Sequence, residues 1–178
     1  KILTIKPTFK WVFLFIKTVK YHKLSEIQFN EMHKEFAVFL ATQSITKKDW
    51  AIIKYGKPEL LDNYLNSFSD LVWDKILSDC EYLEYSSSDQ LFLFHTKERL
   101  IDVLVLKIDS NLADLNTSNG FKKVLNLMHS DQIDIFKSSK AYTPSRNMFI
   151  YEYLKKGAMI SKGKRYEILK SYFPNSSK

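Results

Sequence analysis

The chain has few of the residues that mark disulfide-rich, repetitive or linker-like proteins. Its 178 residues include one cysteine, four glycines and four prolines. A lone cysteine, Cys80, excludes an internal disulfide, and a zinc site would need ligands of other types around it. We therefore expect Cys80 to be a buried thiol near a helix end, and the protein to be cytoplasmic. Scarce glycine and proline argue against collagen-like and linker-rich architectures.

Long apolar runs are also missing. The apolar run near the start, residues 11–16, is six residues long, whereas a membrane-spanning helix needs about 20 and a signal peptide about 7–15. We predict no membrane span. Residues 1–19 are either a short basic amphipathic anchor or an extension outside the folded domain. Helix signals begin only at Leu24, which favours the extension. Residues 174–178 are predicted to be a tail.

The apolar content is nevertheless sufficient for a folded core. Apolar residues make up 45% of the chain and aromatic residues 15%, which suits one globular domain of this length. We predict a single α+β domain over residues 20–173.

The net charge of +7 is unevenly distributed. Residues 1–23 carry six lysines and no acid, and residues 154–178 carry seven basic residues against one glutamate, so that each end contributes +6 and the middle −5. The chain is thus an acidic body with two basic ends, and its total charge is a poor guide to its partners.

The first half of the chain has strong helix signals. Ser25 with Gln28, and Thr46 with Asp49, form capping boxes at the starts of two helices. The first of these helices is expected to continue through residue 40. Pro58 begins a third helix, which runs to about residue 79.

The second half reads as strands and then helices. Short aromatic or β-branched runs at 81–85, 91–95 and 100–108 predict a three-stranded antiparallel meander. A helix over 117–128 and a fourth strand over 132–136 follow. Thr143 and Pro144 are predicted to start another helix that Gly157 ends, and Ser161 to cap a last one. The fold is therefore predicted to be α+β, with N-terminal helices packed on a three- or four-stranded, mainly antiparallel sheet and with C-terminal helices.

Most motifs of known chemistry are absent. The segment from Gly157 to Lys164 has five residues between its glycines, where a phosphate-binding P-loop has four, and no predicted strand precedes it. The four histidines lack metal-ligand spacing, and no glycine–serine–glycine elbow indicates a hydrolase. We expect no cofactor, no metal and no evident small-molecule site.

The order of elements resembles the core of restriction-endonuclease-like enzymes. Such enzymes hold Mg²⁺ with clustered carboxylates and place a lysine two residues after one of them. Asp102 lies on the third predicted strand, but Val105 stands two residues before Lys107. Glu84 and Asp134 are the carboxylates that would have to join Asp102. The sequence thus allows a divergent, inactive nuclease-like fold as one hypothesis.

The C-terminal segment interleaves basic and aromatic residues, a pattern found in proteins that bind nucleic acids or acidic partners. It also suits a solvated helix face whose tyrosines pack on the core. The candidate binding residues are Lys155, Lys156, Lys162, Lys164 and Arg165.

Several strings together resemble an uncharacterised family of small bacterial proteins classed as a domain of unknown function. They are FLATQSITKKDW (39–50), FSDLVWDKIL (68–77), YLEYSSSDQLFLF (82–94), Gly120–Phe121 and GAMISKG (157–163). The resemblance covers about residues 20–173 and implies no activity, cofactor or catalytic residue. One departure is Tyr85, where the resemblance leads us to expect histidine.

Two main functional hypotheses follow. The first is a non-catalytic interaction or accessory protein with an unidentified protein partner, because no set of titratable residues has the spacing that catalysis needs. The alternative is a nucleic-acid-associated protein that uses the basic C-terminal segment. Both predict a protein that is not an enzyme.

Overall fold

The structure is a computed structural model, and it describes residues 19–173. The predictions for the 1–19 extension and the 174–178 tail concern segments outside the described residues, apart from Val19. The contacts divide the chain into two compact units, with the boundary in the sequence between Trp73 and Asp74. The helix α4 (Pro58–Asp79) runs through this boundary. The single domain over residues 20–173 stays a prediction. No helix in the described part of the chain has the length and hydropathy that crossing a membrane requires.

The first unit is helical. It contains α1 (Glu26–Glu31), α2 (His33–Thr42), α3 (Lys47–Gly56) and the first part of α4. Both predicted capping boxes are present, at Ser25 and at Thr46. The first predicted helix is wrong in one respect, because it breaks at Met32 into α1 and α2. No glycine or proline marks this break in the sequence.

Aromatic rings fill the interior of the first unit. Phe36 lies at the centre, with ring centroids 5.0 Å from Phe68 and 5.2 Å from Trp50. The segment that precedes α1 is tied to α4 by polar groups: the buried Asp70 carboxylate accepts hydrogen bonds from the backbone amides of residues 20 and 21. The segment from residue 20 to residue 24 is therefore attached to α4 within this unit.

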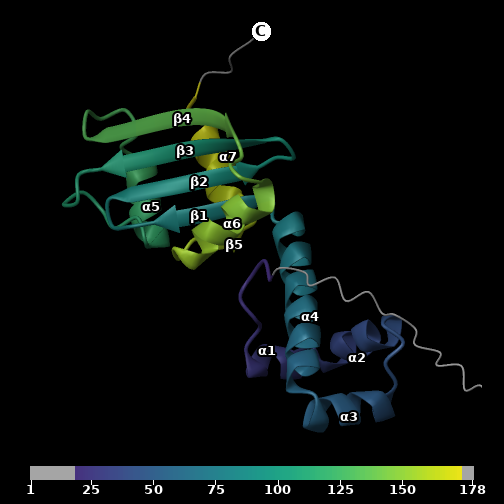
Figure 1. Ribbon diagram of the computed structural model, residues 1–178. Coiled ribbons are helices and arrows are strands. Elements are labelled where there is room, and N and C mark those ends of the chain that lie inside the picture. The colour runs from purple at the N-terminus through teal and green to yellow at the C-terminus, as the bar shows by residue number, and fades with distance from the viewer. Residues whose placement is uncertain (1–18, 174–178) are drawn as a thin grey trace, which may run out of the picture. The chain divides into compact units, whose positions relative to one another are not determined.

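The second unit is built on a five-stranded antiparallel sheet in the order β4-β3-β2-β1-β5 (Figure 1). Its strands are β1 (Tyr82–Ser86), β2 (Gln90–Thr96), β3 (Leu100–Ile108), β4 (Ile133–Ala141) and β5 (Met159–Ser161). The predicted meander is confirmed as β1–β3. The fourth strand runs five residues beyond its predicted end, because its second half is polar and exposed at the sheet edge. The strand β5 has only three residues, and no pattern in the sequence predicted it.

Three further helices complete this unit: α5 (Ser118–Leu125), α6 (Arg146–Lys155) and α7 (Lys164–Lys170). Two predicted helix starts are wrong. Ser145 caps α6, so that Pro144 precedes the helix, and Gly163 is the N-cap of α7. The Ser161 hydroxyl instead accepts a hydrogen bond from the Gly163 amide within the turn.

The helices lie on both faces of the sheet. α5 and α7 lie on one face and α6 on the other (Figure 1). The main core lies between the sheet and the α5–α7 layer, and its fully buried members are Leu91, Leu93, Leu104, Leu106, Leu115, Val124 and Leu169. Cys80 is buried directly after α4, as predicted, and burial raises the pKa of its thiol. This layered arrangement leaves the α6 face of the sheet as the less covered one.

Candidate binding face of the sheet

A row of apolar side chains crosses the α6 face of the sheet. Strand register places Tyr85 opposite Phe92, Phe92 opposite Val105, and Val105 opposite Phe136. Side chains at directly opposed positions point to the same face, so these four residues form one continuous row across β1, β2, β3 and β4. We call them the aromatic row. The Tyr85 and Phe92 ring centroids are 6.1 Å apart.

Helix α6 covers only the neighbouring part of this face. Its Phe149 and Tyr153 rings pack on Phe94, with centroids 6.0 and 4.7 Å away, and Phe94 is fully buried. The aromatic row lies one step further along the strands and remains accessible: Tyr85 is 37% exposed and Phe136 54% exposed. Large apolar side chains that are exposed on one continuous surface commonly mark binding sites.

A pocket lies where the part of the face that α6 covers borders the aromatic row. Its volume is about 400 Å³, and it is lined by Tyr85, Phe92, Tyr153 and Lys156. The Lys156 ammonium lies 5.2 Å from the Tyr153 ring centroid, within the range of a cation–π contact. The sequence analysis expected no small-molecule site, whereas the structure has a pocket of the size that small ligands or parts of larger ones occupy.

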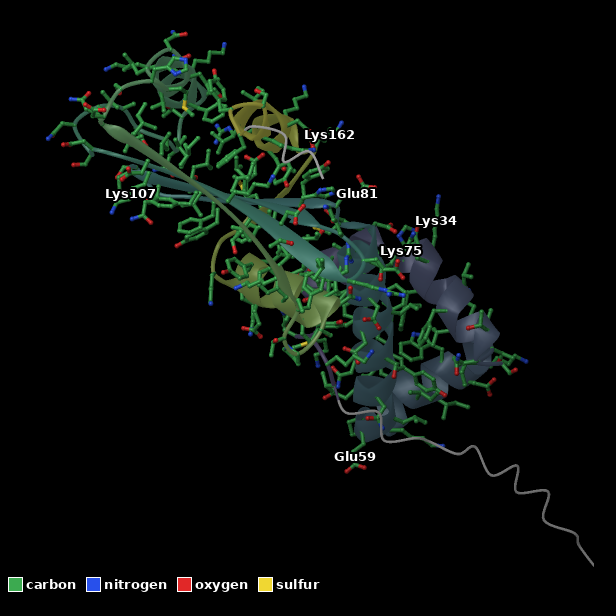
Figure 2. The ribbon with its side chains drawn as sticks, turned by 90° about the horizontal axis from the view of Figure 1, so that it is seen from above. Lys34, Glu59, Lys75, Glu81, Lys107 and Lys162 are labelled. Carbon is green, nitrogen blue, oxygen red and sulfur yellow. The ribbon has the colours of Figure 1, made fainter. Side chains whose placement is uncertain are left out.

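Charged groups on this face are mostly basic. Lys107 and Lys140 point to it from β3 and β4, since they stand opposite Gln90 and Ile101 in the register, and Lys156 follows α6. Figure 2 shows Lys107 on the side of the sheet that carries α6. Asp134 is the acidic residue at the strand positions of this face, opposite Lys107. Lys107 stands two residues from Val105 along β3, and Lys156 lines the pocket with Tyr85 and Phe92, whereas Lys140 stands four residues from Phe136 along β4.

The five predicted basic residues do not form one group. Lys155 and Lys156 are at the end of α6 on one face of the sheet, whereas Lys164 and Arg165 begin α7 on the other (Figure 1). Lys162 lies beside α7 (Figure 2).

Two of the five are engaged within the fold. The Lys155 ammonium pairs with Glu152 at 2.7 Å. Arg165 is largely buried, 3.9 Å from the Glu84 carboxylate and 5.3 Å from the Phe121 ring centroid. Of the predicted set, Lys156 alone lines the pocket, and a binding role for the others stays a prediction.

A cluster of titratable rings lies on the opposite face. The His95 ring stacks on Tyr82 with centroids 4.6 Å apart and meets the edge of Tyr166 at 5.5 Å. Burial raises the pKa of Tyr166, and the nearby Asp102 carboxylate raises it further. Burial lowers the pKa of His95, and the Lys97 ammonium adds to this effect. The rings are therefore neutral near pH 7, and their packing is a structural role.

This burial predicts a pH dependence of stability. Because the pKa of His95 is lower in the folded state than its ordinary value near 6.5, its contribution is complete above about pH 6.5 and is lost as pH falls through the lowered pKa. Chemical denaturation over this range should give a stability curve for His95→Phe that declines less steeply below about pH 6.5. Parallel curves for the two proteins would contradict the assignment.

The carboxylates named by the nuclease hypothesis do not converge. Asp102 points to the α7 face and pairs with Lys97 at 2.6 Å, whereas Asp134 points to the α6 face. Glu84 shares the face of Asp102 but lies beside Arg165. Within residues 19–173, no three histidine, cysteine, aspartate or glutamate side chains are grouped so that they could hold a metal ion.

Comparison with known proteins agrees with the predicted resemblance. No curated protein and no solved structure matches this chain. A family model described as "Family of unknown function (DUF6495)" matches residues 19–174, where the sequence predicted a resemblance over about residues 20–173. The match spans both compact units. The chain therefore belongs to the family of unknown function DUF6495.

Proposed function

We propose that this protein is a non-catalytic binding protein, an accessory component whose partner docks on the α6 face of the sheet. One observation carries the proposal: the aromatic row exposes Tyr85 and Phe136, and its Tyr85 and Phe92 line a pocket that Tyr153 and Lys156 complete. Rings supply large contact areas and lose little conformational freedom on binding, which is why they dominate the energetics of recognition sites. The lysine adds a charge that orients an anionic group.

The proposal places the binding surface on rigid elements. Tyr85, Phe92 and Phe136 stand on paired strands, and Tyr153 is fixed against Phe94 by the packing of α6. A surface that is ordered before binding avoids much of the entropic cost of association. The geometry therefore favours recognition without a large conformational change.

The test is an affinity pull-down from native extract with the full chain, run beside the double variant Tyr85→Ser/Phe136→Ser. We expect the variant to lose the bound partners, because truncation of an aromatic ring that acts as a hot spot of binding costs about 2 kcal/mol or more. The matched control is Tyr55→Ser, which removes an 84% exposed ring on α3. Identical capture by all three proteins would refute the proposed surface.

A further inference from the structure

We infer that the partner of the α6 face is a single-stranded nucleic acid, whose bases stack on the aromatic row and whose phosphates contact the flanking lysines. The inference rests on the proposed function and specifies its ligand. It is argued from the shape of the row, from the type of side chain in it and from the charges beside it.

The geometry of the aromatic row suits several stacked bases. Neighbouring strands are about 4.8 Å apart, so the row from Tyr85 to Phe136 spans three strand spacings, about 14 Å. Phe92 lies between the two exposed rings and is half-buried. Unstacked bases present flat faces to aromatic side chains on such a surface, and this mode of binding tolerates any base sequence. The row is long enough for more than one base.

The α6 face combines aromatic rings with lysines. Lys107 and Lys156 lie near the row, and Lys140 points to the same face with its ammonium 6.0 Å from the Phe149 ring centroid. Asp134 is the acidic residue at the strand positions of this face, and it stands opposite Lys107. Among the described residues, no carboxylate lies within ion-pair distance of Lys156 or Lys140. The face therefore offers positive charge to a ligand.

These features separate a nucleic acid from a protein partner. Lysine is depleted in protein–protein interfaces, where aromatic residues are enriched. An acidic peptide would use the lysines but would leave the rings without a planar partner. A single nucleic-acid strand supplies a planar apolar base and an anionic phosphate in every repeat. It is the polymer whose chemistry matches both parts of this face.

The inferred nucleic-acid surface differs from the one that the sequence predicts. The sequence analysis placed it on Lys155, Lys156, Lys162, Lys164 and Arg165, but these residues are divided between two faces of the sheet. Only Lys156 belongs to the aromatic face. The surface inferred here is formed mainly by β1–β4.

The experiment is fluorescence anisotropy with labelled single-stranded oligonucleotides of about twelve nucleotides, oligo-dT and oligo-dA, and with a duplex of the same length. We expect the full chain to bind both single strands in preference to the duplex. With about three lysine–phosphate contacts, affinity should fall about 10- to 20-fold between about 50 and about 200 mM salt. Phe136→Ala should weaken binding about tenfold, since one stacking ring is lost.

The control variant carries the same lysine-to-glutamine change at a position away from the α6 face. Lys156→Gln should weaken binding and flatten the salt dependence, while Lys123→Gln, which removes an exposed charge on α5, should change neither. Thermal unfolding verifies that each variant is folded. The inference is overturned if the single strands do not bind, if the duplex binds equally well, or if Phe136→Ala binds as well as the unaltered chain. Face-dependent capture of a nuclease-resistant protein, without oligonucleotide binding, would refute the ligand and leave the proposed function standing.

Discussion

Replacing Arg146 by methionine is expected to lower the free energy of unfolding by about 3 kcal/mol, the largest effect of a single polar side chain in the second unit. The Arg146 guanidinium donates hydrogen bonds to the carbonyl oxygens of Leu77 (2.8 Å), Cys80 and Thr96 (3.1 Å). These acceptors belong to the end of α4, to the turn after it and to the end of β2. One side chain thus fixes three chain segments to the first turn of α6.

The expected cost arises from unsatisfied acceptors. Hydrogen bonds from a charged donor contribute about 1.5–3 kcal/mol each, and a buried carbonyl left without a donor is costly. The carbonyl of Leu77 is also one of the last of α4, where the helix dipole favours a cation. Methionine keeps most of the side-chain volume but donates nothing. The comparison therefore measures the loss of the hydrogen bonds and of the charge, with little loss of side-chain volume.

Urea denaturation of Arg146→Met and Arg146→Lys checks this prediction. Lysine keeps the charge but cannot form a planar fork, so we expect it to recover about half of the loss. Arg99→Met is the matched control: Arg99 is exposed in the β2–β3 turn, and its replacement should change stability by less than about 0.5 kcal/mol. A similar small change for Arg146→Met would contradict the assigned role.

Local signals in the sequence predicted much of the fold. The capping boxes at Ser25 and Thr46 satisfy amides within three residues of the cap, so they can be recognised without knowledge of the tertiary structure. The short, aromatic-rich run at residues 91–95, bounded by polar turn residues, predicted β2 for the same reason. By contrast, β5 is a three-residue strand whose only support is pairing with β1, nearly 80 residues earlier in the chain.

The candidate site depended on information that the sequence does not carry locally. The rings of Tyr85, Phe92 and Phe136 come from three strands, and only the register places them in one row. Their exposure depends on where α6 ends, since α6 buries Phe94 but not Phe92. Basic residues that are close together in the sequence predict one group, but the edge strand β5 lies between Lys156 and Lys164 in the chain, and α6 and α7 lie on opposite faces of the sheet (Figure 1).

Replacing Gly120 by alanine is expected to destabilise the protein by about 2–3 kcal/mol. A Cβ atom at this position would lie 1.9 Å from the carbonyl oxygen of Asp114 and 2.6 Å from its carbon. Backbone atoms cannot rotate away as a flexible side chain can, so the loop before α5 would have to move by more than about 1 Å. The same carbonyl accepts hydrogen bonds from the Thr117 amide and hydroxyl, which hold it in place.

Two opposing effects decide whether Gly120→Ala raises or lowers the stability of the protein. Alanine favours a helix by about 1 kcal/mol over glycine, and Gly120 lies in the first turn of α5. The displacement would, however, pull on Leu115, which is fully buried in the main core and whose amide donates to the Ser88 carbonyl. Overpacking of this kind costs about 1–3 kcal/mol and more where backbone must shift. The steric cost therefore exceeds the gain in helix propensity.

Gly56→Ala provides the matched comparison, because Gly56 is also helical and a Cβ atom there would have no neighbour within 4 Å. Its replacement should leave stability unchanged or raise it by up to about 1 kcal/mol. Urea denaturation of both variants measures the difference. Equal stabilities would mean that the loop ending at Thr117 yields without cost. A loss confined to Gly120→Ala would establish that close backbone packing, rather than a flexible turn, is what requires glycine before Phe121.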